Sequence, residues 1–286
     1  MSIIDTHTHV VAADEAAYPL KPAGLPGDWY RSAPCTAEQL LECMDAAGVD
    51  GAVLVQGVGA YSYDNRYAAD SAAACPARFA SACCVDVDGE DPLADLDYWL
   101  CERGMQGVRL FALAREGPSW LADARTFPLW ERARVLGAQV IVTIFYSQLP
   151  ELDAVLSRFP DVPVSLDHCA FPPLAGPPWQ AAEPLLSLAR HPNLYLKVST
   201  HVIDAAGENG GDPADFVCLL AEHFGADRLL WGSDFCQTHD RPYAELVALG
   251  ARAFAGLRAE DRGLCLGANA LRLWPKLARA MQEAAG

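Results

Sequence analysis

Short apolar segments recur along this chain, and the spacing between them leaves room for about one helix each time. The segments are Ser2–Asp5, Gly51–Val55, Phe79–Val85, Gly107–Leu110, Gln139–Ile144, Val164–Asp167, Leu194–Lys197 and Leu229–Gly232. Val140-Ile141-Val142 is apolar at every position, as in parallel strands that helices cover on both faces. Eight strands that alternate with helices predict an α/β fold, a TIM-like (β/α)8 barrel.

The intervening segments carry signals for helices. Thr36 and Gln39 have the spacing of a capping box, and Gly48 is placed to end the helix that follows. The other expected helices are Asp91–Arg103, Phe127–Leu136, Leu149–Phe159, Trp179–Arg190, Pro213–Phe224 and Pro242–Gly256. A doubly wound open sheet is the alternative fold, but the first strand is not followed by Gly-x-Gly-x-x-Gly. Because no linker or repeat divides the chain, we expect residues 1–286 to form a single domain.

Charge and composition restrict the partners. A formal net charge of −16 argues against a nucleic-acid partner, which would need a basic face. No apolar run reaches the roughly 18 residues that cross a membrane, and the amino terminus lacks the features of a signal peptide. We therefore expect a cytoplasmic protein without membrane or nucleic-acid partners. The ten cysteines are scattered and are expected to be reduced, with the roles of Cys169 and Cys236 left open.

Polar residues gather where the predicted strands end, and the carboxyl ends of barrel strands meet at one mouth. His7 and His9 stand at alternate positions, so an extended strand points both to the same side. The other candidates are Asp5, Gln56, Arg109, Tyr146, Asp167, His168, Lys197, Ser199, His201, Ser233, Asp234, Gln237 and His239. The Pro/Gly-rich stretches Pro19–Pro34 and Phe171–Trp179 each follow a strand and are expected to be loops at the same mouth.

A functional role is favoured for four residues, His7, His9, His168 and Asp234, because a barrel would bring them together from three distant strands. Lys197 is interpreted first as a buried salt-bridge partner. Structural roles and roles in the site both stay open for Asp5, Asp167, His201 and His239.

Imidazoles and a carboxylate support hydrolysis by two routes. His7, His9 and Asp234 can bind one divalent ion, with zinc the first choice, and leave a position open for water. Without a metal, Asp234 can take a proton from water while the imidazoles and Arg109 stabilise a developing oxyanion. Asp234 is the base toward the attacking water in both routes, and both routes stay open.

The motifs around these residues resemble those of the amidohydrolase superfamily. They are Asp5-Thr6-His7-Thr8-His9, Leu166-Asp167-His168 and Leu230-Trp231-Gly232-Ser233-Asp234. More narrowly, the chain is similar to the branch that holds 2-pyrone-4,6-dicarboxylate lactonase and the sugar-acid lactonases. The segments that carry this likeness are Val53–Gln56, Asp64–Arg66, Gly107–Leu110, Asp167–Pro172 and Gly267–Trp274. The resemblance covers nearly the whole chain, and its motifs are specific together rather than singly.

This resemblance implies an enzyme that opens a lactone of a small organic or sugar acid by attack of water on the ring carbonyl. His7, His9 and His168 would surround the carbonyl oxygen, Asp234 would activate the water, and Arg109 would hold a substrate carboxylate or ring oxygen. The residues expected to shape the substrate pocket are Tyr146, Gln56, His201 and His239. Barrels of this kind often pair, so a homodimer is a further expectation.

The chain also departs from the family pattern. Many amidohydrolases carry a metal-bridging lysine at the end of the fourth strand, where this chain has Arg109. Many also supply a metal-binding histidine from the fifth strand, where Thr143-Ile144-Phe145-Tyr146 has none. The departures argue against two metal ions, while one ion and metal-free catalysis both stay open. Non-oxidative, metal-dependent decarboxylation is the alternative reaction, and a barrel that binds a metabolite without catalysis is the third hypothesis.

Overall fold

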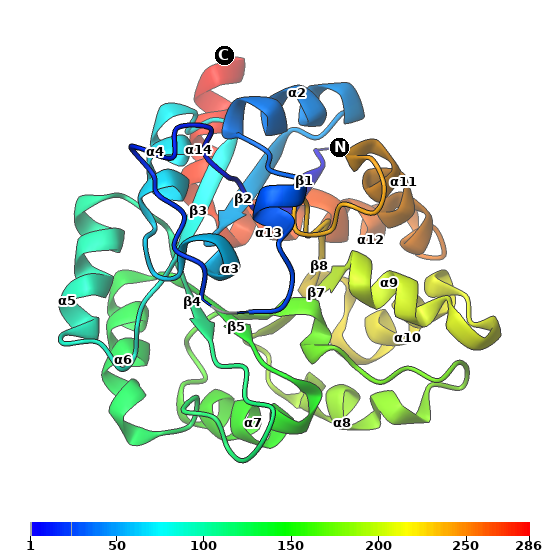
Figure 1. Cartoon of the computed structure of the whole chain (residues 1–286). Helices are drawn as coiled ribbons and strands as arrows, with labels where there is room; N and C mark the ends of the chain where they lie inside the picture. Colours follow the sequence, from blue (N-terminus) through cyan, green and yellow to red (C-terminus); the bar gives the residue numbers. More distant parts are fainter. Residues whose placement is uncertain (1, 24) are drawn as a thin grey trace.

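Eight parallel strands follow one another in chain order around a barrel (Figure 1). They are β1 (Ile4–Thr8), β2 (Gly51–Val55), β3 (Phe79–Cys84), β4 (Gly107–Phe111), β5 (Gln139–Thr143), β6 (Val164–Leu166), β7 (Leu194–Ser199) and β8 (Leu229–Gly232). This computed structural model describes residues 2–23 and 25–286. The predicted TIM-like barrel is confirmed.

The barrel closes between β8 and β1. The Asp234 amide donates to the His7 carbonyl at 2.8 Å, and the His9 amide donates to the Phe235 carbonyl at 2.6 Å. Gly232 permits this approach, because a Cβ there would lie 2.8 Å from the Cβ of His7. The closure therefore joins the first and last strands at the position of the candidate site residues.

Helices surround the strands (Figure 1). The longer ones are α2 (Ala37–Ala47), α4 (Arg66–Ala74), α6 (Phe127–Leu136), α7 (Leu149–Arg158), α10 (Pro213–Phe224), α11 (Tyr243–Ala253) and α14 (Pro275–Ala285). The shorter ones are α1 (Trp29–Ser32), α3 (Val58–Tyr61), α5 (Pro92–Asp97), α8 (Glu183–Leu186), α9 (Thr200–Ala206), α12 (Ala259–Gly263) and α13 (Asn269–Leu273). Thr36 and Gln39 form the predicted capping box, and Gly48 ends α2 in the left-handed conformation. Across residues 2–23 and 25–286, none of the helices is both long and apolar enough to span a bilayer.

Several expected elements differ from the observed ones by a few residues, and two of them bear on the site or the loops around it. The first strand runs over Ile4–Thr8 rather than Ser2–Asp5, so His7 lies within it. The expected helix over 179–190 is interrupted: only Glu183–Leu186 is α-helical, between tighter turns. Pro184 lies in the first turn of α8, where its missing amide hydrogen is tolerated, but it could not continue a helix from the preceding residues.

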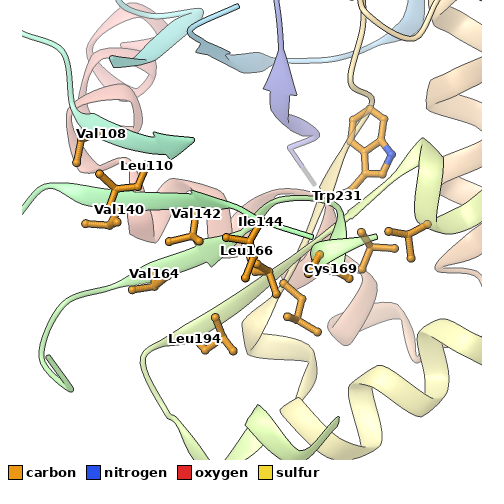
Figure 2. Close-up of a cluster of buried hydrophobic side chains, with 14 of the residues drawn as sticks. Val108, Leu110, Val140, Val142, Ile144, Val164, Leu166, Cys169, Leu194 and Trp231 are labelled. Carbon is orange, nitrogen blue, oxygen red and sulfur yellow. The ribbon is translucent and has the colours of Figure 1, made fainter. Parts of the chain in front are cut away.

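Apolar side chains form two layers of core. Figure 2 shows part of the outer layer, in which side chains of β4 to β8 such as Val108, Val140 and Trp231 are buried. An inner cluster joins residues of β1, β2, β3, β5 and β8 to the carboxyl-terminal helices: Ile4, Val53, Val55, Ala80, Ala82, Ile141, Leu230, Trp274 and Leu277. Hydrocarbon therefore fills the end of the barrel next to the carboxyl-terminal helices, and the polar site residues lie toward the carboxyl ends of the strands.

A register shift in β1 sets which side chains enter the barrel. Ile4 belongs to the inner cluster, and strict alternation would point His7 to the opposite side. The pairing of β1 with β2 shifts between Asp5 and Thr8, and a bulge of this kind reverses the alternation. His7 therefore faces the interior as Ile4 does, while Asp5 bonds to Tyr243 of α11.

Candidate active site

The structure brings His7, His9, His168 and Asp234 together at the carboxyl end of the barrel. Each is at most 2% exposed. Oδ1 of Asp234 lies 3.4 Å from Nε2 of His7 and 3.3 Å from Nε2 of His9. The rings of His7 and His168 have centroids 4.9 Å apart. Side chains more than two hundred positions apart in the chain thus share one buried site.

Left-handed backbone places two of these residues. His168 has φ of 53° and Asp234 has φ of 63°, and the left-handed stretch after β6 continues through Phe171. Residues other than glycine rarely adopt this conformation, which costs on the order of 1 kcal/mol or more per residue. Backbone hydrogen bonds hold it here, since the Phe171 amide donates to the His168 carbonyl at 2.8 Å and the Asp234 amide donates to the His7 carbonyl. Backbone outliers of this kind concentrate at functional sites.

Hydrogen bonds to the Nδ1 atoms orient the two imidazoles of β1. Nδ1 of His9 lies 2.8 Å from the Val55 carbonyl, which can only accept, so this nitrogen carries the proton. Nδ1 of His7 lies 3.1 Å from Oδ1 of Asp167, and burial holds the pKa of His7 well below its usual value. Both Nε2 atoms therefore present lone pairs toward Asp234.

Asp167 is the centre of a buried polar network. Its Oδ2 accepts hydrogen bonds from Thr143 Oγ1 at 2.7 Å and from Arg109 Nε at 3.0 Å, and Lys197 Nζ lies 3.1 Å from Oδ1. Burial alone would raise the pKa of Asp167, but the charges of Lys197 and Arg109 and the hydrogen bond from His7 outweigh it and hold that pKa well below the ordinary value. The interpretation of Lys197 as a buried salt-bridge partner is confirmed, and Asp167 fixes the ring of His7.

The second carboxylate oxygen of Asp234 is held from the side away from His7. Oδ2 lies 3.0 Å from Nε2 of His201 and accepts a 3.0 Å hydrogen bond from Thr238 Oγ1. Burial opposes ionisation of Asp234, but the hydrogen bond from His201 and the nearby imidazoles outweigh it and keep the pKa of Asp234 well below its usual value. The same hydrogen bond raises the pKa of His201, whose side chain is 46% exposed.

His168 is a neutral imidazole in this environment. Its Nδ1 lies 2.8 Å from Ser199 Oγ at the end of β7. Burial is the largest influence and lowers the pKa of His168 to about 4. His168 therefore faces the site without a positive charge at neutral pH.

A cavity of about 310 Å³ opens beside these residues. Its polar side chains are Arg109, Thr143, His168, Gln237 and His239, and its apolar side chains include Leu25, Trp29, Val58, Phe111, Leu113 and Phe171. The segment between β1 and α2, dark blue in Figure 1, contributes Trp29, which packs against His9 with ring centroids 5.4 Å apart. A larger and more open groove, lined by Met44, Arg78 and Met281, lies at the start of β2 and α14, away from the imidazole cluster.

Comparison with known proteins identifies the family. A model of the amidohydrolase family matches residues 4–276. This chain belongs to the amidohydrolase family. This amidohydrolase is 29% identical over 242 residues to an L-fucono-1,5-lactonase of Burkholderia ambifaria, a match that covers 81% of this chain and 79% of the relative. The family resemblance that the motifs predicted is confirmed, and this protein is an enzyme.

Solved structures share the fold of this amidohydrolase. A putative 2-pyrone-4,6-dicarboxylic acid hydrolase from Pseudomonas putida is 24% identical, with a TM-score of 0.75 and coverage of 96% of this chain and 98% of that one. A zinc-bound amidohydrolase from Burkholderia multivorans is 22% identical, with a TM-score of 0.77 and coverage of 96% and 99%. A 2,6-dihydroxybenzoate decarboxylase from Rhizobium, 15% identical over 96% and 99% of the chains, has a TM-score of 0.67. At these identities the likeness is one of fold.

The residues of this amidohydrolase fit one divalent metal ion. Nε2 of His7, Nε2 of His9 and Oδ1 of Asp234 are buried and have no hydrogen-bond partner within the part of the chain that the structure describes. The ligand atoms of these three residues lie within 4.8 Å of one another. Two imidazole nitrogens and a carboxylate oxygen are ligands that zinc prefers, and a cation would satisfy three acceptors that otherwise face one another.

The residues predicted to bind substrate lie in different surroundings. Arg109 and His239 line the cavity, and His201 contacts Asp234. The side-chain amide of Gln56 donates to the carbonyls of Ser62 and Asp64, and the Tyr146 hydroxyl donates to the Ala181 carbonyl at 2.6 Å. Gln56 and Tyr146 are absent from the described lining of the cavity, so their predicted part in binding would have to act through the loops that they hold.

Sequence reasoning missed the apolar side of the cavity. Trp29 and Phe171 come from the two Pro/Gly-rich stretches that were expected to be loops at this mouth. Phe111 is the last residue of β4, and Leu113 lies two residues beyond it. The position of these residues just after strands was the available signal, but an apolar residue in a loop does not by itself indicate a binding wall.

Proposed function

We propose that this amidohydrolase opens a lactone of a small organic or sugar acid by attack of water on the ring carbonyl. The observation that carries the proposal is the convergence of three buried atoms beside the cavity, His7 Nε2, His9 Nε2 and Asp234 Oδ1, which have no hydrogen-bond partner among the described residues. Similarity to an L-fucono-1,5-lactonase and a fold shared with a 2-pyrone-4,6-dicarboxylic acid hydrolase support a cyclic ester as the reacting group.

Asp234 is the base in the proposed mechanism. Its carboxylate is ionised, and Oδ2 is engaged by His201 and Thr238. Oδ1 faces the site with two lone pairs, one for a bound metal ion and one for the proton of the attacking water. The low pKa of Asp234 makes it a weak base. A divalent ion bound by His7, His9 and Asp234 would polarise the carbonyl and lower the pKa of its bound water to roughly 7, so the weakness of the base favours the metal-dependent route.

Arg109 and His168 border the cavity where negative charge would develop on the carbonyl oxygen. Arg109 keeps two of its five N–H groups outside the hydrogen bonds to Thr143, Asp167 and Gln56. Fixed donors at a dry site stabilise an oxyanion without reorganising during the reaction. These side chains therefore supply the electrostatic part of the proposed mechanism, and the network around Asp167 keeps them in place.

A panel of lactones tests the proposal. The protein is purified without chelator, and acid release is followed in a pH-stat with and without added zinc, using L-fucono-1,5-lactone, D-galactono-1,4-lactone, 2-pyrone-4,6-dicarboxylate and the uncharged δ-hexanolactone. We expect turnover of at least one lactone and a loss of about 1,000-fold or more in Asp234→Asn. His223→Gln, at an exposed position on α10, is the matched control and should keep wild-type activity. Failure to open any lactone in either metal state would overturn the proposal.

Decarboxylation is the second candidate, because a decarboxylase shares this fold. The end of β5 offers Thr143 and no imidazole, which weighs against this candidate. Release of carbon dioxide from 2,6-dihydroxybenzoate by the zinc-loaded protein, without turnover of lactones, would favour it over hydrolysis.

A further inference from the structure

Hydrocarbon forms most of the wall of the cavity beside the imidazole cluster. Trp29, Val58, Phe111, Leu113 and Phe171 line it from four different loops or strand ends. Val58 is 5% exposed and Trp29 is 6% exposed, so both are held in packed positions rather than on mobile surface. A ligand that fills about 310 Å³ must therefore lie against hydrocarbon on several sides.

The positive charge of Arg109 at this cavity is already engaged by a buried carboxylate, Asp167. Among the described residues that line it, Arg109 is the single side chain with a permanent charge. Asp167 accepts from its Nε at 3.0 Å and lies 3.0 Å from its second terminal nitrogen. Its guanidinium also lies 4.9 Å from the centroid of the Phe111 ring. A substrate with two carboxylates would meet no pair of free cationic side chains among the described residues of the lining.

Few polar groups are available for hydroxyls. The Thr143 hydroxyl donates to Asp167, the Arg109 Nε–H is shared by Thr143 and Asp167, and Nδ1 of His239 lies 2.8 Å from the Gln237 carbonyl. Among the polar side chains of the described lining, the groups outside these hydrogen bonds are the Gln237 amide, Nε2 of His168 and two N–H groups of Arg109. A sugar lactone carries a hydroxyl on almost every ring carbon, and a hydroxyl buried against hydrocarbon loses its hydrogen bonds to water without replacement.

We propose that the preferred substrate is an uncharged lactone with an alkyl or aryl substituent, rather than a polyhydroxylated lactone or a dicarboxylate. The inference rests on the proposed lactone hydrolysis and narrows its substrate class. The ring carbonyl lies toward His168 and Arg109, and the substituent packs on the wall formed by Val58, Phe111 and Leu113. Specificity then comes from burial of hydrocarbon.

A homologous series of substrates tests the inference. kcat/KM is measured for δ-valerolactone, δ-hexanolactone and δ-octanolactone and is compared with the value for D-glucono-1,5-lactone. Each CH₂ group buried against the wall is expected to raise kcat/KM by about fourfold. D-Glucono-1,5-lactone is expected to be at least about tenfold poorer than δ-hexanolactone. A higher kcat/KM for the glucono compound or for 2-pyrone-4,6-dicarboxylate overturns the inference and leaves lactone hydrolysis standing.

A variant of the wall links the preference to this cavity. Leu113→Gln places an amide at the lining and should reduce the gain per CH₂ to less than twofold. Val135→Gln makes the same kind of change on α6, at a side chain that is 65% exposed and is not among the described lining residues, and should keep the wild-type gain in kcat/KM per CH₂. If kcat/KM of Leu113→Gln still rises about fourfold per CH₂ group, the proposed wall is wrong.

Binding of unreactive lactams separates this inference from the proposed function. Titration calorimetry compares 6-propyl-2-piperidone with D-glucono-δ-lactam on the zinc-loaded protein. Tighter binding of the alkyl lactam supports the apolar wall even if no lactone is hydrolysed, a result that would overturn hydrolysis alone. Equal or tighter binding of the polyhydroxylated lactam overturns the inference whatever the lactone panel shows.

Discussion

Nε2 of His201 lies 3.0 Å from Oδ2 of Asp234, on the opposite oxygen from the one that faces His7 and His9. An ionised carboxylate only accepts, so His201 donates in this hydrogen bond. Thr238 Oγ1 donates to the same oxygen at 3.0 Å. The two donors prevent the carboxylate from rotating, and this keeps Oδ1 directed at the imidazoles.

The hydroxyl of Thr238 should therefore matter for turnover. Thr238→Val preserves the shape of the side chain and removes one of the two donors, so we expect kcat to fall by about tenfold while KM changes by less than twofold. Thr238→Ser keeps the hydroxyl and should recover most of kcat. Steady-state kinetics on one lactone decides the matter, and a rise in KM at constant kcat would contradict a role in positioning Asp234.

Metal binding should depend on His9 more than on His168. His9 contributes an unpartnered Nε2 to the candidate metal site, whereas His168 lines the cavity and bonds to Ser199. We expect His9→Gln to weaken zinc binding by roughly 100-fold or more, while His168→Gln retains zinc and loses kcat. Zinc retained after dialysis against a competing chelator, measured by atomic absorption, distinguishes the two variants. Equal retention by both variants would speak against this assignment of ligands.

The repeated β/α pattern made most of the fold predictable. Gly51–Val55 and Leu229–Gly232 are strands with the expected bounds, and Phe127–Leu136 and Pro213–Phe224 are helices with the expected bounds. The two strands are continuous apolar runs and the two helices are amphipathic, and each segment has a proline or glycine at or near an end. The bulge in β1 was not predictable, because it depends on how the barrel closes against β8.

The part of the site that lies at the ends of the strands was predictable from the sequence. Barrel topology brings His7, His9, His168 and Asp234 together without reference to loops. The left-handed backbone at His168 and Asp234 has no local signal, since neither residue is glycine, and tertiary hydrogen bonds impose it. The apolar wall depends on the course of loops, which hydrophobic periodicity does not specify.

Lys197 should contribute to stability through Asp167. Its ammonium lies 3.1 Å from Asp167 Oδ1, and both side chains are at most 1% exposed. Removing one partner of a buried pair leaves the other charge poorly compensated, so Lys197→Met should lower the free energy of unfolding by about 3 kcal/mol. The exposed Lys276→Met should change it by less than about 0.5 kcal/mol. Urea denaturation measures both values. An unchanged free energy of unfolding in Lys197→Met would show that Arg109 and Thr143 are enough to stabilise the Asp167 carboxylate.

Asp5 should make stability depend on pH between about 4 and 6. Burial is the largest influence on Asp5 and raises its pKa from 3.8 to about 6, against hydrogen bonds from Ser233, His7 and Tyr243. Between these values the folded state keeps a proton that the unfolded state has released. Protonated Asp5 therefore stabilises the folded state fully below pH 4. This stabilisation, roughly 3 kcal/mol in the free energy of unfolding, is lost as the pH rises through 6.

Asp5→Asn isolates this effect, because an amide resembles the protonated carboxyl and cannot ionise. The Asn oxygen can accept from the amides of His7 and Ser233, as the Asp5 carboxylate does. Free energies of unfolding are measured by urea denaturation in the presence of chelator at pH 4.5, 5.5 and 6.5. The value for the variant should rise relative to that of the wild type as the pH rises. Asp161→Asn, at an exposed position, is the control for removal of one carboxylate. If the stability of the wild type instead rises relative to that of Asp5→Asn as the pH rises, the raised pKa of Asp5 is contradicted.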